Sequence, residues 1–231
     1  MKVGTEQEWQ SARKELLAAE RELEEHAQRV EKQRQELPWV PVENEYTFVT
    51  EDGSRSLPEL FEGRSQLLIY HAMFGEDWEV ACPGCSSLVD GLSGTVGHLN
   101  DRDVTLVCMS HAPLEKLLDY KRPRGWTVPW VSAYGNDFLF DYGYAFRRED
   151  MPGIARGEFD MGQLLHEAPP WLRDYREEVG APDLESAVSV SAGWSVFAMC
   201  DGAAYNTYRV YPHSRIITPP FSVLLELLPT R

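Results

Sequence analysis

Cysteine, positive charge and long apolar runs are all scarce in this chain of 231 residues. Four cysteines are too few to form a framework of structural disulfides. Lys and Arg number 22 against 37 Asp and Glu, and the net charge of −15 makes nucleic acid and anionic membranes poor partners. No apolar run approaches the roughly 18 residues that span a bilayer, and the first residues lack the apolar core of a signal peptide. We therefore expect a cytoplasmic protein without a nucleic-acid or membrane partner.

The first 37 residues are predicted to form an N-terminal helical arm. Residues 5–36 contain neither Gly nor Pro, and Pro38 ends the pattern. Apolar residues recur there at spacings of three, four and seven, as one helix face requires: Trp9, Ala12, Leu16, Ala19, Leu23 and Val30. Two interpretations remain open. The helix packs on its own domain, or it is an arm through which two copies of the chain form a homodimer.

Residues 38–231 are predicted to form one α/β domain. Apolar runs predict strands at 46–49, 66–73, 103–109, 127–132, 195–200 and 203–211, and helices are predicted after residue 82 and at 113–120 and 221–228. Strands that alternate with helices predict a sheet with parallel pairs that is covered on both faces. The polar stretch over about 147–192 is interpreted as an insertion, partly helical near 172–179, that serves as a mobile lid.

A Cys-Pro-Gly-Cys tetrapeptide follows the strand predicted at 66–73. Pro83 suits the first turn of a helix, which places Cys82 at the helix N-terminus. Unpaired amides and the helix dipole there favour a thiolate, and Cys85 lies one turn further on. This pattern is typical of a nucleophilic thiol with a resolving thiol. Cys108 and Cys200 lie in apolar strand-like runs and are interpreted as packing residues.

A metal site is the alternative for the same two thiols. Cys-x-x-Cys chelates soft metals well, and His71, at the end of the preceding strand, is the best-placed third ligand for copper or iron. Without a metal, His71 would act as a base or electrostatic partner for Cys82. The thiol-exchange interpretation, which we favour, requires no cofactor. A closed zinc site is not predicted, because the chain has no second Cys-x-x-Cys.

An aromatic pocket beside the thiols is a further hypothesis. Such a pocket would hold a small molecule or a thiol or disulfide substrate, with Tyr134 and Asp137 as polar groups. Ordinary core packing of the aromatic residues is the competing interpretation. The candidate lining residues are Trp78, Trp126, Trp130, Tyr134, Asp137 and Phe138.

Two long segments resemble a bacterial thioredoxin-like family known as domain of unknown function 899. They are LLIYHAMFGEDWEVACPGCSSLVDG and HLNDRDVTLVCMSHAPLEKLLDYKRPRGWTVPWVSAYGNDFLFDYG. The flanks LPWVPVENEYTF and GWSVFAMCDGAAYNTY also look like those of the family, so the resemblance covers nearly the whole chain. It implies a thioredoxin-like fold of the peroxiredoxin branch. The expected structure is a central mixed sheet flanked by helices, with the N-terminal arm and an insertion before the C-terminal β-hairpin. The resemblance implies no particular reaction.

Three departures from related sequences bear on function. Peroxiredoxins carry Thr or Ser just before the nucleophile, whereas Ala81 stands here, which disfavours a peroxidase. Thioredoxins have a Pro before the strand that faces the thiols, whereas this chain has Trp194 and Ser195, which leaves room for a metal. Asn206 stands where related chains often have His, so if that His is a functional ligand in the relatives, the function of this chain differs from theirs. Thiol–disulfide oxidoreduction is the favoured function, and a metal-dependent enzyme or metal-binding protein is the alternative.

Overall fold

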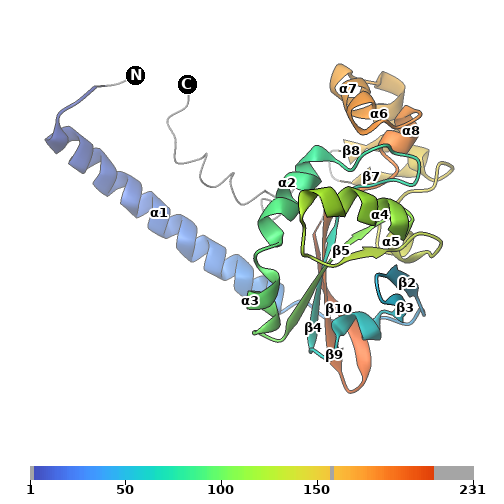
Figure 1. Cartoon of the computed structure of the whole chain (residues 1–231). Helices are drawn as coiled ribbons and strands as arrows, with labels where there is room; N and C mark the ends of the chain where they lie inside the picture. Colours follow the sequence, from blue (N-terminus) through green and yellow to red (C-terminus); the bar gives the residue numbers. More distant parts are fainter. Residues whose placement is uncertain (1–2, 157–158, 211–231) are drawn as a thin grey trace. The chain divides into compact units, whose positions relative to one another are not determined.

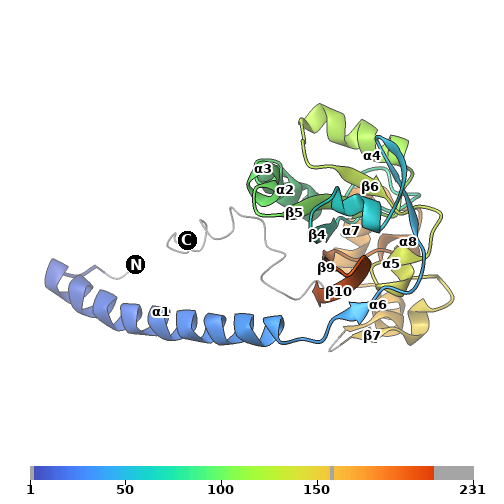
Figure 2. The same ribbon diagram turned by 90° about the horizontal axis from the view of Figure 1, so that it is seen from below.

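The computed structural model describes residues 3–156 and 159–210 and divides the chain into two units, Met1–Trp39 and Val40–Arg231. The first unit contains helix α1, Glu6–Gln35, which is one continuous helix (Figure 2). A capping box starts α1: the Thr5 hydroxyl accepts a hydrogen bond from the amide of Glu8, and the Glu8 carboxylate accepts one from the amide of Thr5. None of its residues is buried. Among the described helices, none is both long and apolar enough to cross a membrane.

The second unit is built on a mixed sheet of eight strands in the order β1-β10-β9-β4-β5-β6-β2-β3. Its centre is β4 (Gln66–His71), which pairs in parallel with β5 (Val104–Ser110) and antiparallel with β9 (Gly193–Cys200). Strand β10 (Ala203–Val210) forms a hairpin with β9 through Asp201 and Gly202. The strands predicted at 66–73, 103–109, 195–200 and 203–211 are thereby confirmed, within a few residues at their ends.

This arrangement is a thioredoxin-like fold. Two parallel strands, β4 and β5, are joined by a crossover that contains α2 (Pro83–Leu92) and α3 (Val96–Asn100), and an antiparallel hairpin extends the sheet beyond β4. Figure 1 shows the sheet in the middle of this unit with α2, α3 and α4 (Leu114–Lys121) beside it. The Cys-Pro-Gly-Cys stretch begins the crossover helix, after the loop that follows the central strand.

Further strands widen the sheet on both sides. Strand β1 (Val40–Pro41) pairs with β10, and on the other side β6 (Trp130–Ser132), β2 (Thr47–Thr50) and β3 (Gly53–Ser56) follow β5. Short helical turns lie at Pro58–Phe61, Arg122–Arg124 and Phe138–Asp141 (α5). The predicted helix at 221–228 lies outside the described residues.

The inserted segment is more structured than predicted. It contains the turn Met151–Gly153, the strands β7 (Ala155–Arg156) and β8 (Phe159–Asp160), and the helices α6 (Met161–Glu167), α7 (Pro170–Val179) and α8 (Leu184–Ala187). Figure 1 shows α6, α7 and α8 together at one end of this unit. Leu172, Val179 and Ala187 are buried and belong to the main hydrophobic core. These residues of the segment therefore belong to the core, and the role of the segment as a mobile lid stays a prediction.

The two faces of the sheet carry different side chains around β4. Successive residues of a strand point to opposite faces, so Tyr70 and His71 lie on different sides of the sheet. In the neighbouring strands Cys108 and Trp194 are in register with Tyr70. This alternation decides which side chains can approach the thiols.

Candidate thiol site

Cys82 occupies the N-cap of α2, and Pro83 is the first helical residue. Pro is pre-organised for that position and has no amide hydrogen to leave unpaired. The connection from β4, residues 72–82, is called the thiol loop below. It is tied down at both ends, because the Cys82 amide donates to the Met73 carbonyl over 2.9 Å and the Met73 amide donates to the Cys85 sulfur over 3.3 Å. The predicted placement of Cys82 at a helix N-terminus is confirmed.

Hydrogen bonding lowers the pKa of the Cys82 thiol to about 6. The largest cause is the Cys85 thiol, which donates to the Cys82 sulfur; burial acts in the opposite direction, and the Tyr175 hydroxyl and the amides of Cys85 and Gly84 lower the pKa further. Cys82 makes no conventional capping hydrogen bond, so these amides act on its sulfur as nearby dipoles. Because Cys82 is only partly buried, its thiolate is accessible at neutral pH.

Cys85 has the opposite character. It is buried, and both its interaction with Cys82 and its burial raise the pKa of its thiol well above the usual value. The Tyr70 hydroxyl and the Met73 amide interact with the Cys85 sulfur from the sheet side. Both thiols are free in the structure. The site therefore holds one acidic, accessible thiol and one protonated, buried thiol.

The inserted segment packs directly on the thiol loop. The amides of Glu79 and Val80 both donate to the Val179 carbonyl at the end of α7, over 2.9 Å and 3.3 Å. Gly180 follows with φ of +65°, and a Cβ atom there would lie 2.5 Å from the Glu79 side chain. A glycine is needed at this position for both reasons. The end of α7 and the approach to Cys82 thus form one packed unit.

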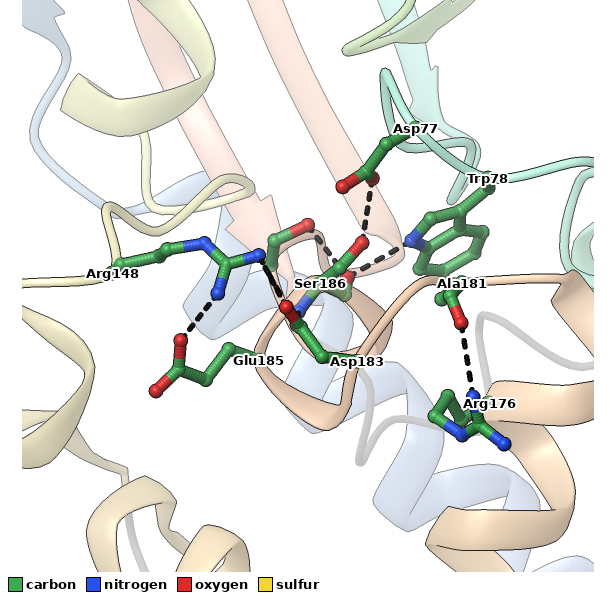
Figure 3. Close-up of polar contacts among 9 residues, drawn as sticks. Asp77, Trp78, Arg148, Arg176, Ala181, Asp183, Glu185 and Ser186 are labelled. Atoms are coloured by element: carbon green, nitrogen blue, oxygen red, sulfur yellow. Dashed lines mark hydrogen bonds and ion pairs between the residues drawn. The ribbon is translucent and has the colours of Figure 1, made fainter.

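A second set of contacts joins α8 to the same loop (Figure 3). The Trp78 indole donates to the Ser186 carbonyl over 2.9 Å, and the Ser186 hydroxyl donates to the Asp77 carboxylate over 2.6 Å. On the other side of α8, Arg148 forms ion pairs with Asp183 and Glu185. Trp78 is fully buried, so these contacts hold the thiol loop against α8 on the side that faces the protein interior.

Tyr175 is the site residue that sequence reasoning missed. It lies on α7, where its ring meets the Trp78 ring edge to face at 5.8 Å. Its buried hydroxyl makes no hydrogen bond of ordinary geometry within the described residues, yet it is close enough to Cys82 to lower the pKa of that thiol. Burial and the Cys82 charge in turn raise the pKa of Tyr175, so it remains a proton donor. Its place in a polar insertion gave no local signal.

His71 does not lie beside the thiols, contrary to the prediction. Its ring stacks on Tyr144 with centroids 3.6 Å apart, and its Nε2 lies 2.8 Å from the Ser195 hydroxyl. Tyr70, the preceding residue, faces Cys85, so strand alternation turns His71 to the opposite face of the sheet. Burial lowers the pKa of His71 well below its usual value. Its Nδ1 has no partner among the described residues, which fits a neutral ring that donates from Nε2.

The alternative metal site is not assembled in the part of the chain that the structure describes. No group of three or more His, Cys, Asp or Glu side chains there could hold a metal ion. Cys82 and Cys85 lie at one end of α2, and the third proposed ligand, His71, lies across the sheet. The ligand set of Cys82, Cys85 and His71 predicted for copper or iron is therefore wrong.

The predicted aromatic pocket does not form as one cavity. Of its six candidates, Trp78 lies in the thiol loop and packs on Tyr175, and Tyr134 contacts the loop only through Glu76. Trp126 and Trp130 pack on each other at 5.5 Å, and both are buried. Phe138 is buried on the His71 side of the sheet, at 6.4 Å from the His71 ring.

The two polar candidates of that pocket are engaged elsewhere. The Tyr134 hydroxyl donates to the Glu76 carboxylate over 2.6 Å, and Asp137 pairs with Arg147 over 2.5 Å at the exposed surface. The candidate aromatic side chains lie on both faces of the sheet. Residues that are close in sequence therefore do not line one cavity here. The competing interpretation, core packing, describes Trp126, Trp130 and Phe138.

A groove of about 470 Å³ does lie between the thiol loop and α4. The loop contributes Phe74 and Glu79, and the other lining residues are Pro113, Glu115, Lys116, Asp119 and Tyr120. Three of these carry a negative charge, and the Lys116 ammonium donates to the Glu76 carbonyl over 2.8 Å. The groove is therefore acidic, and it contacts the thiol loop through Phe74 and Glu79.

Over residues 1–230 the sequence matches the family described as bacterial protein of unknown function (DUF899). The chain belongs to this family. The resemblance expected from the Cys-Pro-Gly-Cys region and its flanks is thereby confirmed. No curated protein matches the chain.

Several solved structures are similar to this DUF899 chain. Peroxidoxin BcpB from Mycobacterium tuberculosis is 12% identical with a TM-score of 0.41, covering 75% of this chain and 80% of its own. Peroxiredoxin Q from Xanthomonas campestris is 10% identical with a TM-score of 0.47, covering 84% and 94%. A putative protein disulfide isomerase from Bacteroides thetaiotaomicron is 13% identical with a TM-score of 0.43, covering 83% and 88%. Similarity at this level carries no information about substrates.

Asn206, where DUF899 chains were expected to carry His, has a structural role here. It is buried on β10, and its amide donates to the Val196 carbonyl over 3.0 Å and to the Tyr208 carbonyl over 3.3 Å. The register between β9 and β10 shifts between Asn206 and Tyr208. The amide therefore satisfies backbone carbonyls at an irregular point of the hairpin.

Proposed function

We propose that this protein is a thiol–disulfide oxidoreductase in which Cys82 is the attacking thiolate and Cys85 the resolving thiol. The observation that carries the proposal is the asymmetry of the two thiols. Cys82 is accessible and surrounded by hydrogen-bond donors, whereas Cys85 is buried and protonated. The thiolate is the nucleophile in such exchange, and its reactivity depends on its pKa and its access.

The proposed reaction proceeds in two exchanges. The Cys82 thiolate attacks one sulfur of a substrate disulfide, forms a mixed disulfide and releases the first substrate thiolate. Cys85 then loses its proton and attacks the Cys82 sulfur, which forms the Cys82–Cys85 disulfide and releases the second thiolate. The substrate gains two electrons and the protein loses two. A cellular dithiol must return them, and no bound cofactor takes part.

The acidic groove beside the thiol loop supports a class of substrate. Glu79, Glu115 and Asp119 would repel an anionic disulfide, and the net charge of −15 acts in the same direction. We therefore expect a cationic or neutral disulfide to react faster than an anionic one. The comparison uses cystamine against dithiodipropionate, and added salt should reduce the difference. Equal rates for cystamine and dithiodipropionate at low salt would show that the acidic groove does not select the substrate.

A single-turnover assay tests the reaction itself. The reduced protein is mixed with excess cystamine, and mass spectrometry follows the released cysteamine and the protein disulfide. The assay uses the Cys200→Ser background, because Cys200 is an exposed thiol outside the site that would itself exchange with cystamine. This protein should release two equivalents and lose two hydrogens through a Cys82–Cys85 bond, and adding Cys82→Ser should abolish both. The proposal fails if the double variant matches the background protein.

Peroxide reduction is the weaker form of the same chemistry. The residue before Cys82 is Ala81, which is buried and has no hydroxyl to place beside a peroxide. Hydrogen peroxide should therefore oxidise the reduced protein more slowly than cystamine does at equal concentration. Faster oxidation by peroxide would make a peroxidase the better description.

A further inference from the structure

Helix α1 carries an exposed apolar stripe along its whole length. The side chains of Trp9, Leu16 and Leu23 are 61%, 53% and 62% exposed, and Val30 is 37% exposed. An isolated helix gains most of its stability from packing of an apolar face. At about 1.5 Å per residue, the 30 residues of α1 extend about 45 Å. We therefore expect this apolar stripe to be covered by a partner surface of similar length.

The stripe has the spacing of a coiled coil. Trp9, Leu16, Leu23 and Val30 are seven residues apart and take the a positions of four heptads. The d positions of the first two heptads are the small, exposed residues Ala12 and Ala19, and the last two are His26 and Gln33. A strict repeat of seven residues is the pattern of a left-handed supercoil. The surface formed by positions a and d is called the heptad face below.

We propose that the heptad face pairs with the same face of a second copy of this chain, with the two helices antiparallel. Antiparallel pairing places a positions against d positions. In the register that sets Leu23 against Ala19 of the second copy, Val30 lies against Ala12, Leu16 against His26 and Trp9 against Gln33. Each large apolar residue then meets a smaller or a polar side chain and not its own copy. Parallel pairing would place each alanine against its own copy and leave thin, poorly filled layers between the large ones.

Charges that flank the heptad face support the same direction. A parallel pair brings Glu15 beside Glu20 of the second copy and Arg29 beside Arg34, with Glu8 beside Arg13 as its one opposite-charge contact. An antiparallel pair brings two kinds of opposite charges together, Glu15 with Arg29 and Glu6 with Arg34 of the second copy. It also leaves Glu8 beside Glu36, and Glu20 and Glu22 each near their own copy, so its like-charge contacts are offset by more opposite-charge contacts than in the parallel pair. Opposite charges at such positions favour a pairing direction, and like charges disfavour it.

Light scattering on the full chain tests the dimer. Wild type should show twice the 26.3 kDa of one chain, and the double variant Leu16→Glu, Leu23→Glu should show one chain mass. Leu17→Glu is the matched control, because Leu17 is 37% exposed on the same helix but lies outside the heptad face. It should remain dimeric. Circular dichroism and cystamine turnover in all three confirm that the second unit is folded.

Charge exchange tests the direction. Glu15→Arg should weaken the dimer at low salt, and adding Arg29→Glu should restore it. If Glu15→Arg strengthens the dimer, the pairing is parallel and the antiparallel proposal is overturned. A monomeric wild type at tens of micromolar would overturn the proposed dimer. The occupant of the heptad face would then be a segment of the same chain, such as 211–231. A dimer that survives the double variant would also overturn it.

Discussion

Replacing Tyr175 with Phe should raise the pKa of Cys82 without disturbing the fold. The substitution removes the hydroxyl that lies near the Cys82 sulfur and keeps the ring that packs on Trp78 at 5.8 Å. A well-formed hydrogen bond to a charged group contributes about 1.5–3 kcal/mol, which corresponds to about one or two pKa units, and the Tyr175 hydroxyl falls short of ordinary hydrogen-bond geometry. Because the Cys85 thiol and two amides still stabilise the thiolate, we expect the lower end, a rise of about one unit.

This rise has a distinctive effect on the rate of exchange. With a pKa of about 6, roughly nine-tenths of Cys82 is ionised at pH 7, and a rise of about one unit leaves roughly half. At pH 5.5 the thiolate fraction falls about eight-fold. A more basic thiolate is also more nucleophilic, by about three-fold for one unit. The net rate should therefore fall about three-fold at pH 5.5 and rise about three-fold at pH 9.

The assay is the pH profile of reaction with 2,2′-dithiodipyridine, followed by release of the thione, in a Cys200→Ser background. Tyr134→Phe is the matched control, because it removes a hydroxyl that bonds to the carboxylate of Glu76 in the thiol loop but not to a sulfur. Its profile should equal that of the background protein. General damage would lower the rate at every pH. An unchanged midpoint in Tyr175→Phe, or an equal shift in Tyr134→Phe, would refute the assigned role.

Three further predictions concern the same domain. Cys85→Ala should raise the Cys82 midpoint by about one to two units and trap a stable mixed disulfide, detected by mass spectrometry; release of a second thiol would contradict it. Gly180→Ala should destabilise the fold by about 1 kcal/mol or more and raise the pH midpoint of Cys82 ionisation, because φ is +65° and the Glu79 side chain leaves no space for a Cβ atom. Gly153→Ala is the control: a Cβ atom there meets open space, so neither the stability nor the midpoint should change. His71 is neutral when folded and gains a proton on unfolding below about pH 6.5, so the unfolding free energy should fall as pH drops below 6.5, with a slope that approaches about 1.4 kcal/mol per pH unit. Urea titrations at several pH values should show that the unfolding free energy of His71→Phe depends less steeply on pH than that of wild type. An equal pH dependence would exclude His71 as the source of the effect.

The parts of the fold that local sequence patterns describe were predicted correctly. The heptad of α1, the apolar run before Cys82 and the Asp201-Gly202 turn each depend on residues that are neighbours in sequence, so their periodicity is visible without a structure. Pro83 similarly located the helix N-terminus. The thiol pair could therefore be placed at the start of a helix from the Cys-Pro-Gly-Cys tetrapeptide alone.

The surroundings of the thiols depend on contacts between distant segments. Tyr175 comes from α7, about ninety residues after Cys82, and reaches the sulfur only because Val179 and Gly180 pack on the thiol loop. The polar composition of the insertion suggested a lid, since its few buried residues are spread over several short helices. No local pattern in that segment points to a contact with Cys82.

The strand-end histidine shows how a difference of one residue reverses a functional interpretation. Tyr70 and His71 end the same strand, and the pleat sends one toward the thiols and the other to the opposite face. Had His71 faced the sulfurs, it could have been a base or a ligand. With Tyr70 there instead, the groups around the two sulfurs are hydroxyls, amides and thiols. Such donors stabilise a thiolate on Cys82 without a fixed positive charge, and the thiolate is the form that the proposed exchange reaction requires.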